Sequence, residues 1–118
     1  MFFLLCLFLY KASSISECSS GTLTIPAGST RIPDYQYAYC SKFTGSLTIP
    51  DTVKKIGSYA FVGCSGLTGS LIIPDSVTSI GQYAFSECTG FDGSLTLSNY
   101  ITSIESNTFS NCYGFIGS

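Results

Sequence analysis

Apolar positions recur along the chain at a constant step of 24 residues. Glycine keeps this step at Gly21, Gly45, Gly69, Gly93 and Gly117, and cysteine keeps it at Cys40, Cys64, Cys88 and Cys112. A fixed period of this length is the signature of a repeat architecture, in which one small unit is copied along the chain. The sequence therefore divides into four units at 21–44, 45–68, 69–92 and 93–116, and residues 117–118 begin a fifth.

Each unit opens with a pattern that is typical of a strand. In the second unit, Leu47-Thr48-Ile49 alternates apolar and polar residues with a period of two. Pro50 follows and has no N–H to donate to a neighbouring strand. The pattern predicts a short strand that ends in a turn at Pro50-Asp51, and Pro74-Asp75 predicts the same turn in the third unit.

The second half of each unit predicts a helical segment. Ile56, Ala60 and Cys64 are spaced by four residues, and Phe61 lies beside Ala60. This spacing indicates one or two turns of α- or 3₁₀-helix with an apolar stripe on one side.

One unit cannot bury its own apolar side chains, because they all line a single thin layer. Stacking of units is therefore obligatory, with the parallel strands of successive units about 4.8 Å apart. The predicted fold class is an α/β repeat solenoid of four 24-residue units, each with a short parallel strand, a turn and a short helical or 3₁₀ segment.

Two stretches carry a resemblance to a known family. The strings SLTIPDTVKKIGSYAFVGCSGL and SLIIPDSVTSIGQYAFSECTGF resemble the BspA-type leucine-rich repeat, whose pattern is L-x-I-P-x-x-V-x-x-I-G-x-x-A-F-x-x-C. The resemblance covers residues 21–118 and implies a horseshoe-like leucine-rich-repeat fold. Members of the family are surface or extracellular proteins associated with adhesion and host-protein binding, so the resemblance also implies a surface-antigen role.

The first and fourth units depart from this pattern. The first carries Ser29, Pro33 and Gln36-Tyr37 where the pattern has Val, Gly and Ala-Phe, as expected of a terminal repeat. The fourth replaces Pro-Asp with Ser98-Asn99. Since no polar cap follows it, we expect either an uncovered C-terminal edge through which the chain self-associates, or a fragment of a longer array.

Residues 1–16 are predicted to be a signal peptide. Residues 1–10 are an apolar run, shorter than the ~20 residues that a membrane-spanning helix needs. Ser14 and Ser16 then form a small-x-small cleavage pattern. The alternatives are an apolar cap strand or a misplaced gene start, because no Lys or Arg precedes the run. Residues 17–20 are predicted to form an N-terminal cap on the solenoid at 21–118, and the chain to be secreted or displayed at the cell surface.

Composition and charge exclude several classes of function. Charged residues make up 10% of the chain, against roughly 25% in a typical domain, so the surface must be built from Ser, Thr, Tyr and Gly. The net charge is −2 and the basic residues are scattered, which excludes a nucleic acid partner. The chain has no histidine and no phosphate-binding or nucleophile motif, so we expect neither an enzyme nor a cofactor.

The four in-phase cysteines are predicted to form a structural ladder of Cys40, Cys64, Cys88 and Cys112. Three interpretations compete. The cysteines could be small apolar core residues, which fits their place in the apolar stripe. They could be disulfide partners, since neighbouring ladder cysteines are close enough, but their side chains point in parallel directions. They could be metal ligands, but the sequence lacks a C-x-x-C pair. Cys18 lies two residues off this phase and is assigned to the cap.

Asp51 and Asp75 occupy one column of the repeat. Asp after Pro commonly accepts hydrogen bonds from its own turn, and we expect this role. Calcium is the alternative, but two carboxylates supply too few oxygens for it, so no metal site is predicted.

Two surfaces are candidates for recognition. Tyr35, Tyr59 and Tyr83 form one column and could either contact a ligand or shield the neighbouring backbone. The other candidate surface is the outward side of the strands, which offers a flat array of hydroxyls. Its residues are Thr24, Ser46, Thr48, Ser70, Ile72, Ser94 and Thr96.

The leading prediction is a secreted or surface module for adhesion that binds a protein or glycan ligand on an exposed face. The alternative is a truncated piece of a repeat array with a purely structural role. A hydrolase is disfavoured because the sequence offers no histidine, activated nucleophile or convergent pocket.

Overall fold

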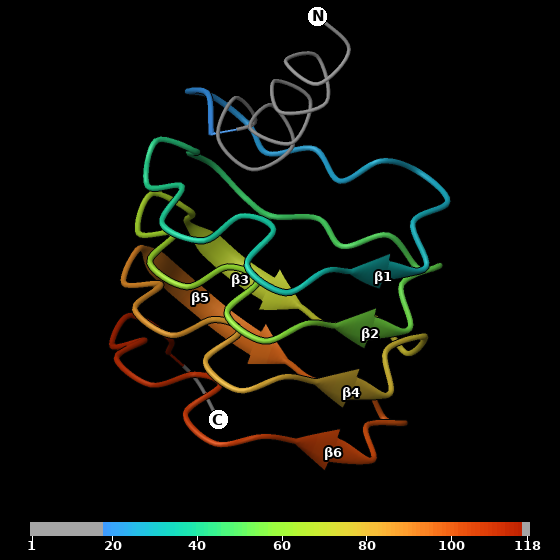
Figure 1. Cartoon of the computed structure of the whole chain (residues 1–118). Helices are drawn as coiled ribbons and strands as arrows, with labels where there is room; N and C mark the ends of the chain where they lie inside the picture. Colours follow the sequence, from blue (N-terminus) through green and yellow to red (C-terminus); the bar gives the residue numbers. More distant parts are fainter. Residues whose placement is uncertain (1–17, 117–118) are drawn as a thin grey trace, which may run out of the picture.

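The computed structural model describes residues 18–116, and in it each repeat unit lies beside the next in parallel. Strands β1 (Arg31–Ile32), β2 (Lys55–Ile56), β4 (Ser79–Ile80) and β6 (Ser103–Ile104) form a four-stranded parallel sheet in this order (Figure 1). The register joins equivalent positions of successive units, as in the pairs Ile32 with Ile56 and Ile56 with Ile80. The predicted repeat fold with parallel strands is therefore present.

The leucine-bearing segments at the start of the units form a second, less continuous sheet. Strands β3 (Gly69–Ile72) and β5 (Phe91–Thr96) pair in parallel, with Leu71 opposite Leu95 (Figure 1). In the first two units the same segments, with the residues that lead into them, meet at two isolated bridges, Gly21 with Phe43 and Thr24 with Thr48. The residues that lead into the third unit meet the segment of the second at the bridge between Gly45 and Leu67. Among the described residues, no β-pairing joins 46–49 to 70–73.

The predicted helical segment was wrong, because residues 18–116 contain no helix. The Phe61 N–H donates to the Ala84 carbonyl of the next unit at 2.8 Å, whereas the Val62 N–H closes a turn on the Tyr59 carbonyl at 3.3 Å. A helix would direct every one of these donors to its own carbonyls. Tyr59 also has φ of 58°, which interrupts any right-handed helix. The segment is thus a run of turns that hydrogen-bonds sideways to the neighbouring unit.

The turn that follows each strand forms as predicted, but its carboxylate has another role. The Val53 N–H donates to the Pro50 carbonyl at 3.1 Å, and the third unit repeats the turn. Asp75 was expected to cap its own turn. Its Oδ1 accepts instead the backbone N–H of Asn99, in the next unit, at 2.9 Å. The carboxylate therefore links two units.

The apolar columns form one core that runs along the stack. Phe61 and Phe85 stack with ring centroids 5.0 Å apart, and Phe85 and Phe109 with centroids 5.5 Å apart. The positions that are wholly excluded from solvent belong to the second and third units and include Val53, Ile56, Phe61, Leu67, Leu71, Val77, Ile80 and Phe85. Fourth-unit equivalents such as Phe109 and Leu95 are only partly buried.

Several predicted segments lie outside the described residues. These are the signal peptide at 1–16 and the start of a fifth unit at 117–118; of the predicted cap at 17–20, only residues 18–20 are described. Within the described part of the chain, no helix has the length and apolar character needed to cross a membrane.

Candidate functional site

The alternation within each strand segment places two kinds of side chain on opposite sides. Leu47 and Ile49 point into the core and are buried, while Thr48 between them is exposed. All seven residues predicted on the strand face are exposed. This surface is therefore a row of small hydroxyls held over an apolar core, with a single aliphatic exception.

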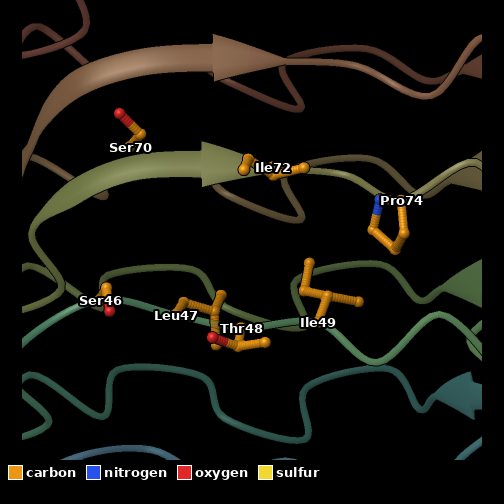
Figure 2. A pocket seen from close by; sticks show the side chains of 7 residues that line it. All are labelled: Ser46, Leu47, Thr48, Ile49, Ser70, Ile72 and Pro74. Atoms are coloured by element: carbon orange, nitrogen blue, oxygen red, sulfur yellow. The ribbon is translucent and has the colours of Figure 1, made fainter.

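The exception is Ile72. It is 61% exposed, and the equivalent residues of the other units are Thr24, Thr48 and Thr96. The side chain stands at a depression of about 310 Å³ between the second and third units. Figure 2 shows the lining side chains, which come from the two neighbouring units and are Ser46, Leu47, Thr48, Ile49, Ser70, Ile72 and Pro74. Four of the seven predicted strand-face residues thus meet at one place.

The backbone pairing beside the depression is short. On one side of it Thr24 pairs with Thr48, and on the other Ile72 pairs with Thr96. The segment of the second unit pairs with the residues that lead into the third at the bridge between Gly45 and Leu67, but this pairing does not continue to Thr48 and Ile72. Strand edges that are not held in a ladder can accept hydrogen bonds from another chain. The site therefore combines an apolar side chain, several hydroxyls and a short stretch of backbone without β-pairing between the second and third units.

The predicted tyrosine column is a stack of parallel rings. Tyr35 and Tyr59 have ring centroids 4.8 Å apart, and Tyr59 and Tyr83 have centroids 4.9 Å apart. Burial, followed by the neighbouring phenols of Tyr35 and Tyr83, raises the pKa of Tyr59. Asn107 continues the column and donates from Nδ2 to the Tyr83 hydroxyl at 3.0 Å. Because the ring faces cover one another, the column offers mainly ring edges and hydroxyls to a ligand.

The cysteine ladder is not uniform. Cys40 forms a disulfide with Cys18, and not with another ladder cysteine. Cys64, Cys88 and Cys112 are free thiols. The expectation of an unpaired apolar cysteine was therefore wrong for Cys40. The sequence signal that could have indicated this pair is the leftover Cys18 in front of the first unit.

The free thiols are also hydrogen-bond donors, a role that the sequence pattern does not indicate. The Cys64 thiol donates to the Tyr37 carbonyl at 3.0 Å, and the Cys112 thiol donates to the Phe85 carbonyl at 2.9 Å. Burial raises the pKa of Cys64 to about 12. A thiol with so high a pKa is a poor nucleophile and a poor metal ligand at neutral pH.

The stacked parallel units and their exposed hydroxyl face define a repeat protein with a surface suited to contact. The family described as "BspA type Leucine rich repeat region (6 copies)" matches residues 10–116. The chain belongs to this family of leucine-rich repeats. The match begins ahead of the first 24-residue unit and overlaps the predicted signal peptide. Comparison with curated proteins and with solved structures gave no match.

Proposed function

We propose that this chain is a secreted or cell-surface adhesion module, a short leucine-rich-repeat solenoid that binds a protein ligand through its strand face and catalyses no reaction. The observation that carries the proposal is Ile72, an exposed aliphatic side chain in a column that is otherwise threonine. Leucine-rich repeats generally mediate protein binding, which supports the choice of ligand class.

The chemistry around Ile72 is that of a small protein contact. An aliphatic side chain that loses water on binding provides affinity, and the hydroxyls of Ser46 and Ser70 beside it provide orientation. Charged residues are absent from the lining of this depression. A ligand with a small apolar side chain and backbone donors and acceptors would complement it.

The proposal is tested with the purified full chain and immobilised collagen, fibronectin and laminin, measured by surface plasmon resonance. We expect at least one of these proteins to bind, and Ile72→Asp to weaken that binding at least tenfold. Gln82→Asp is the matched control, because it adds the same charge at an exposed position away from the strand face. The absence of binding to all three, or an equal loss in both variants, would reject the proposal. Recovery of the chain only from the interior of its source cells would reject the secreted location.

A second candidate role is self-association through the fourth unit. Ile104 is 43% exposed and Ile116 is 67% exposed, and both would be covered if another unit stacked against them. Light scattering of the full chain tests this role: an oligomer that Ile104→Ser dissociates supports it, and a monomer at high concentration contradicts it.

A further inference from the structure

A second depression, of about 500 Å³, runs along the stack on a surface that contains none of the predicted binding residues. It crosses all four units. One row of its lining is Tyr39, Gly63, Glu87 and Asn111, which occupy the same position in successive units, and Tyr113 of the fourth unit also lines it. We call this depression the lateral groove.

The second row of residues that lines the lateral groove carries hydroxyls. Ser41, Ser65 and Thr89 are equivalent residues of the first three units, and all three are exposed. Their side chains make no hydrogen bond to the described part of the protein. Adjacent units are about 4.8 Å apart, and the ring centroids of Tyr59 and Tyr83, which lie in adjacent units, are 4.9 Å apart. The row therefore presents one hydroxyl, which can donate and accept, for each such step along the stack. This step is close to the length of one sugar residue in an extended chain.

Two exposed aromatic rings line the groove. Tyr39 is 65% exposed and Tyr113 is 80% exposed. Neither ring stacks on another aromatic ring of residues 18–116, in contrast to the tyrosine column. Gly63 makes room for Tyr39, because a Cβ there would lie 2.6 Å from Cδ1 of the tyrosine ring. An exposed aromatic ring that is not stacked on another ring suits the apolar C–H face of a sugar ring.

The charge of the groove selects a neutral ligand. Glu87 is the one charged residue in its lining, and no Lys or Arg lines it. A phosphate, sulfate or sialic acid would therefore meet a carboxylate without a compensating cation. Asn111 accepts a hydrogen bond from the Tyr113 hydroxyl through Oδ1, which leaves its amide N–H groups free to donate. Glu87 can accept from sugar hydroxyls, so the groove offers both kinds of partner.

We propose that the lateral groove is a binding site for a neutral oligosaccharide of about three residues, the length that matches the unit steps between Tyr39 and Tyr113. The sugar chain lies along the stack, with its rings against the two tyrosines and its hydroxyls on Ser41, Ser65 and Thr89. The site shares no residue with the strand face, so it does not depend on the function proposed above.

The test is titration calorimetry of the full chain with the homotrimers of glucose, mannose and N-acetylglucosamine, with their monomers and with a sialylated trisaccharide. We expect at least one neutral trimer to bind saturably, its monomer to bind at least tenfold more weakly, and the sialylated sugar to bind more weakly than the trimer. Failure of all three neutral trimers to bind overturns the proposal.

Variants localise the binding. Tyr113→Ala and Tyr39→Asn should each weaken binding of the trimer at least tenfold, and asparagine suits the left-handed backbone at position 39, as Asn111 does in the fourth unit. Tyr100→Ala is the matched control, because Tyr100 is 64% exposed in the fourth unit but lies outside the groove. Trimer binding that survives in both groove variants while circular dichroism is unchanged would also overturn the proposal.

Discussion

The thiol of Cys88 donates a hydrogen bond to the carbonyl oxygen of Phe61, one unit away, over 3.1 Å. The same carbonyl oxygen also accepts the N–H of Cys64 at 3.1 Å. The Cys88 thiol therefore donates to the second lone pair of the Phe61 oxygen. Each ladder cysteine after the first makes the equivalent bond. The column therefore selects a residue that is apolar enough for the core and still able to donate between units, which alanine or valine cannot do.

The buried thiols predict a loss of stability at alkaline pH. Burial holds the pKa of Cys64 at about 12 and also raises that of Cys88, whereas a thiol in the unfolded chain ionises near ~8.5. The unfolded state therefore loses its protons first. Stability is unaffected below the unfolded pKa and falls above it by about 1.4 kcal/mol per pH unit for each thiol, until pH approaches the folded pKa.

Urea unfolding at pH 8, 9 and 10 measures this dependence. Tyrosine and lysine ionisation also contribute at these pH values, so the informative quantity is the difference between the wild type and a Cys64→Ala, Cys88→Ala double variant. The double variant is expected to be less stable at pH 8 but to lose less stability on going to pH 10. Equal slopes would show that these thiols ionise as readily in the folded protein as in the unfolded chain.

The disulfide at the first unit predicts a second stability effect. Cys40, the ladder cysteine of the first unit, is bonded to Cys18, which lies ahead of that unit. The bond closes a loop with a sequence separation of 22 residues. Loss of such a loop in Cys18→Ser should lower the free energy of unfolding by about 3 kcal/mol, as an upper value. Dithiothreitol should destabilise the wild type to the same extent and leave Cys18→Ser unchanged; a variant as stable as the oxidised wild type would contradict the expected role.

Two aromatic columns should differ in their contribution to stability. Phe61 is excluded from solvent between the rings of Tyr37 and Phe85, at 5.4 and 5.0 Å. Phe61→Ala should therefore cost ~3–5 kcal/mol by opening a cavity. Tyr59→Ala removes a half-buried ring and should cost only about 1 kcal/mol. The comparison is made by urea unfolding, and equal losses would place the tyrosine column within the core.

The sequence was sufficient to predict the repeat, its period and the inward and outward positions of the strands. The reason is that apolar side chains must occupy the same positions in every unit to pack on those of the next unit. It was not sufficient to predict the turns around Tyr59. A spacing of four residues is compatible with a helix, but the Phe61 N–H finds its acceptor on Ala84, in another unit. A hydrogen bond to a residue so distant in sequence cannot be predicted from the local residue pattern. The left-handed backbone conformation at Tyr59 cannot be predicted from the local pattern either, because tyrosine seldom adopts it.

The candidate site was predictable only in part. Ile72 stands in the sequence as an aliphatic residue in a threonine column, so its exposure could be anticipated from the pattern alone. The interruption of β-pairing beside it could not, since Thr48 and Ile72 have the same flanking pattern as the pairs that do form. The lateral groove was missed because Tyr39 and Tyr113 belong to different columns, which the stack brings into the lining of one depression.

Gly66, Gly90 and Gly114 form a column in which each glycine packs closely against the backbone of the preceding unit. Gly66 packs on the first unit, where a Cβ would collide with the carbonyl oxygen of Phe43 and lie 2.6 Å from that of Ser41. Its equivalent in the first unit, Lys42, is exposed and carries a long side chain. The requirement for glycine therefore comes from the unit beneath it. Gly66→Ala should lower the free energy of unfolding by about 3 kcal/mol, since backbone atoms must move to admit the methyl group.

Gly45→Ala is the control for the conformational part of this effect. Gly45 has φ of 79°, and a Cβ there would have Oγ1 of Thr22 as its nearest neighbour, at 3.9 Å. Alanine at this position therefore meets backbone strain of about 1–2 kcal/mol without a collision. Urea unfolding of both variants should rank Gly66→Ala as the more damaging. A methyl group at Gly66 fits only if the distance between the first and second units increases. The opposite order of stabilities would therefore mean that these two units lie farther apart than the hydrogen bonds between them allow.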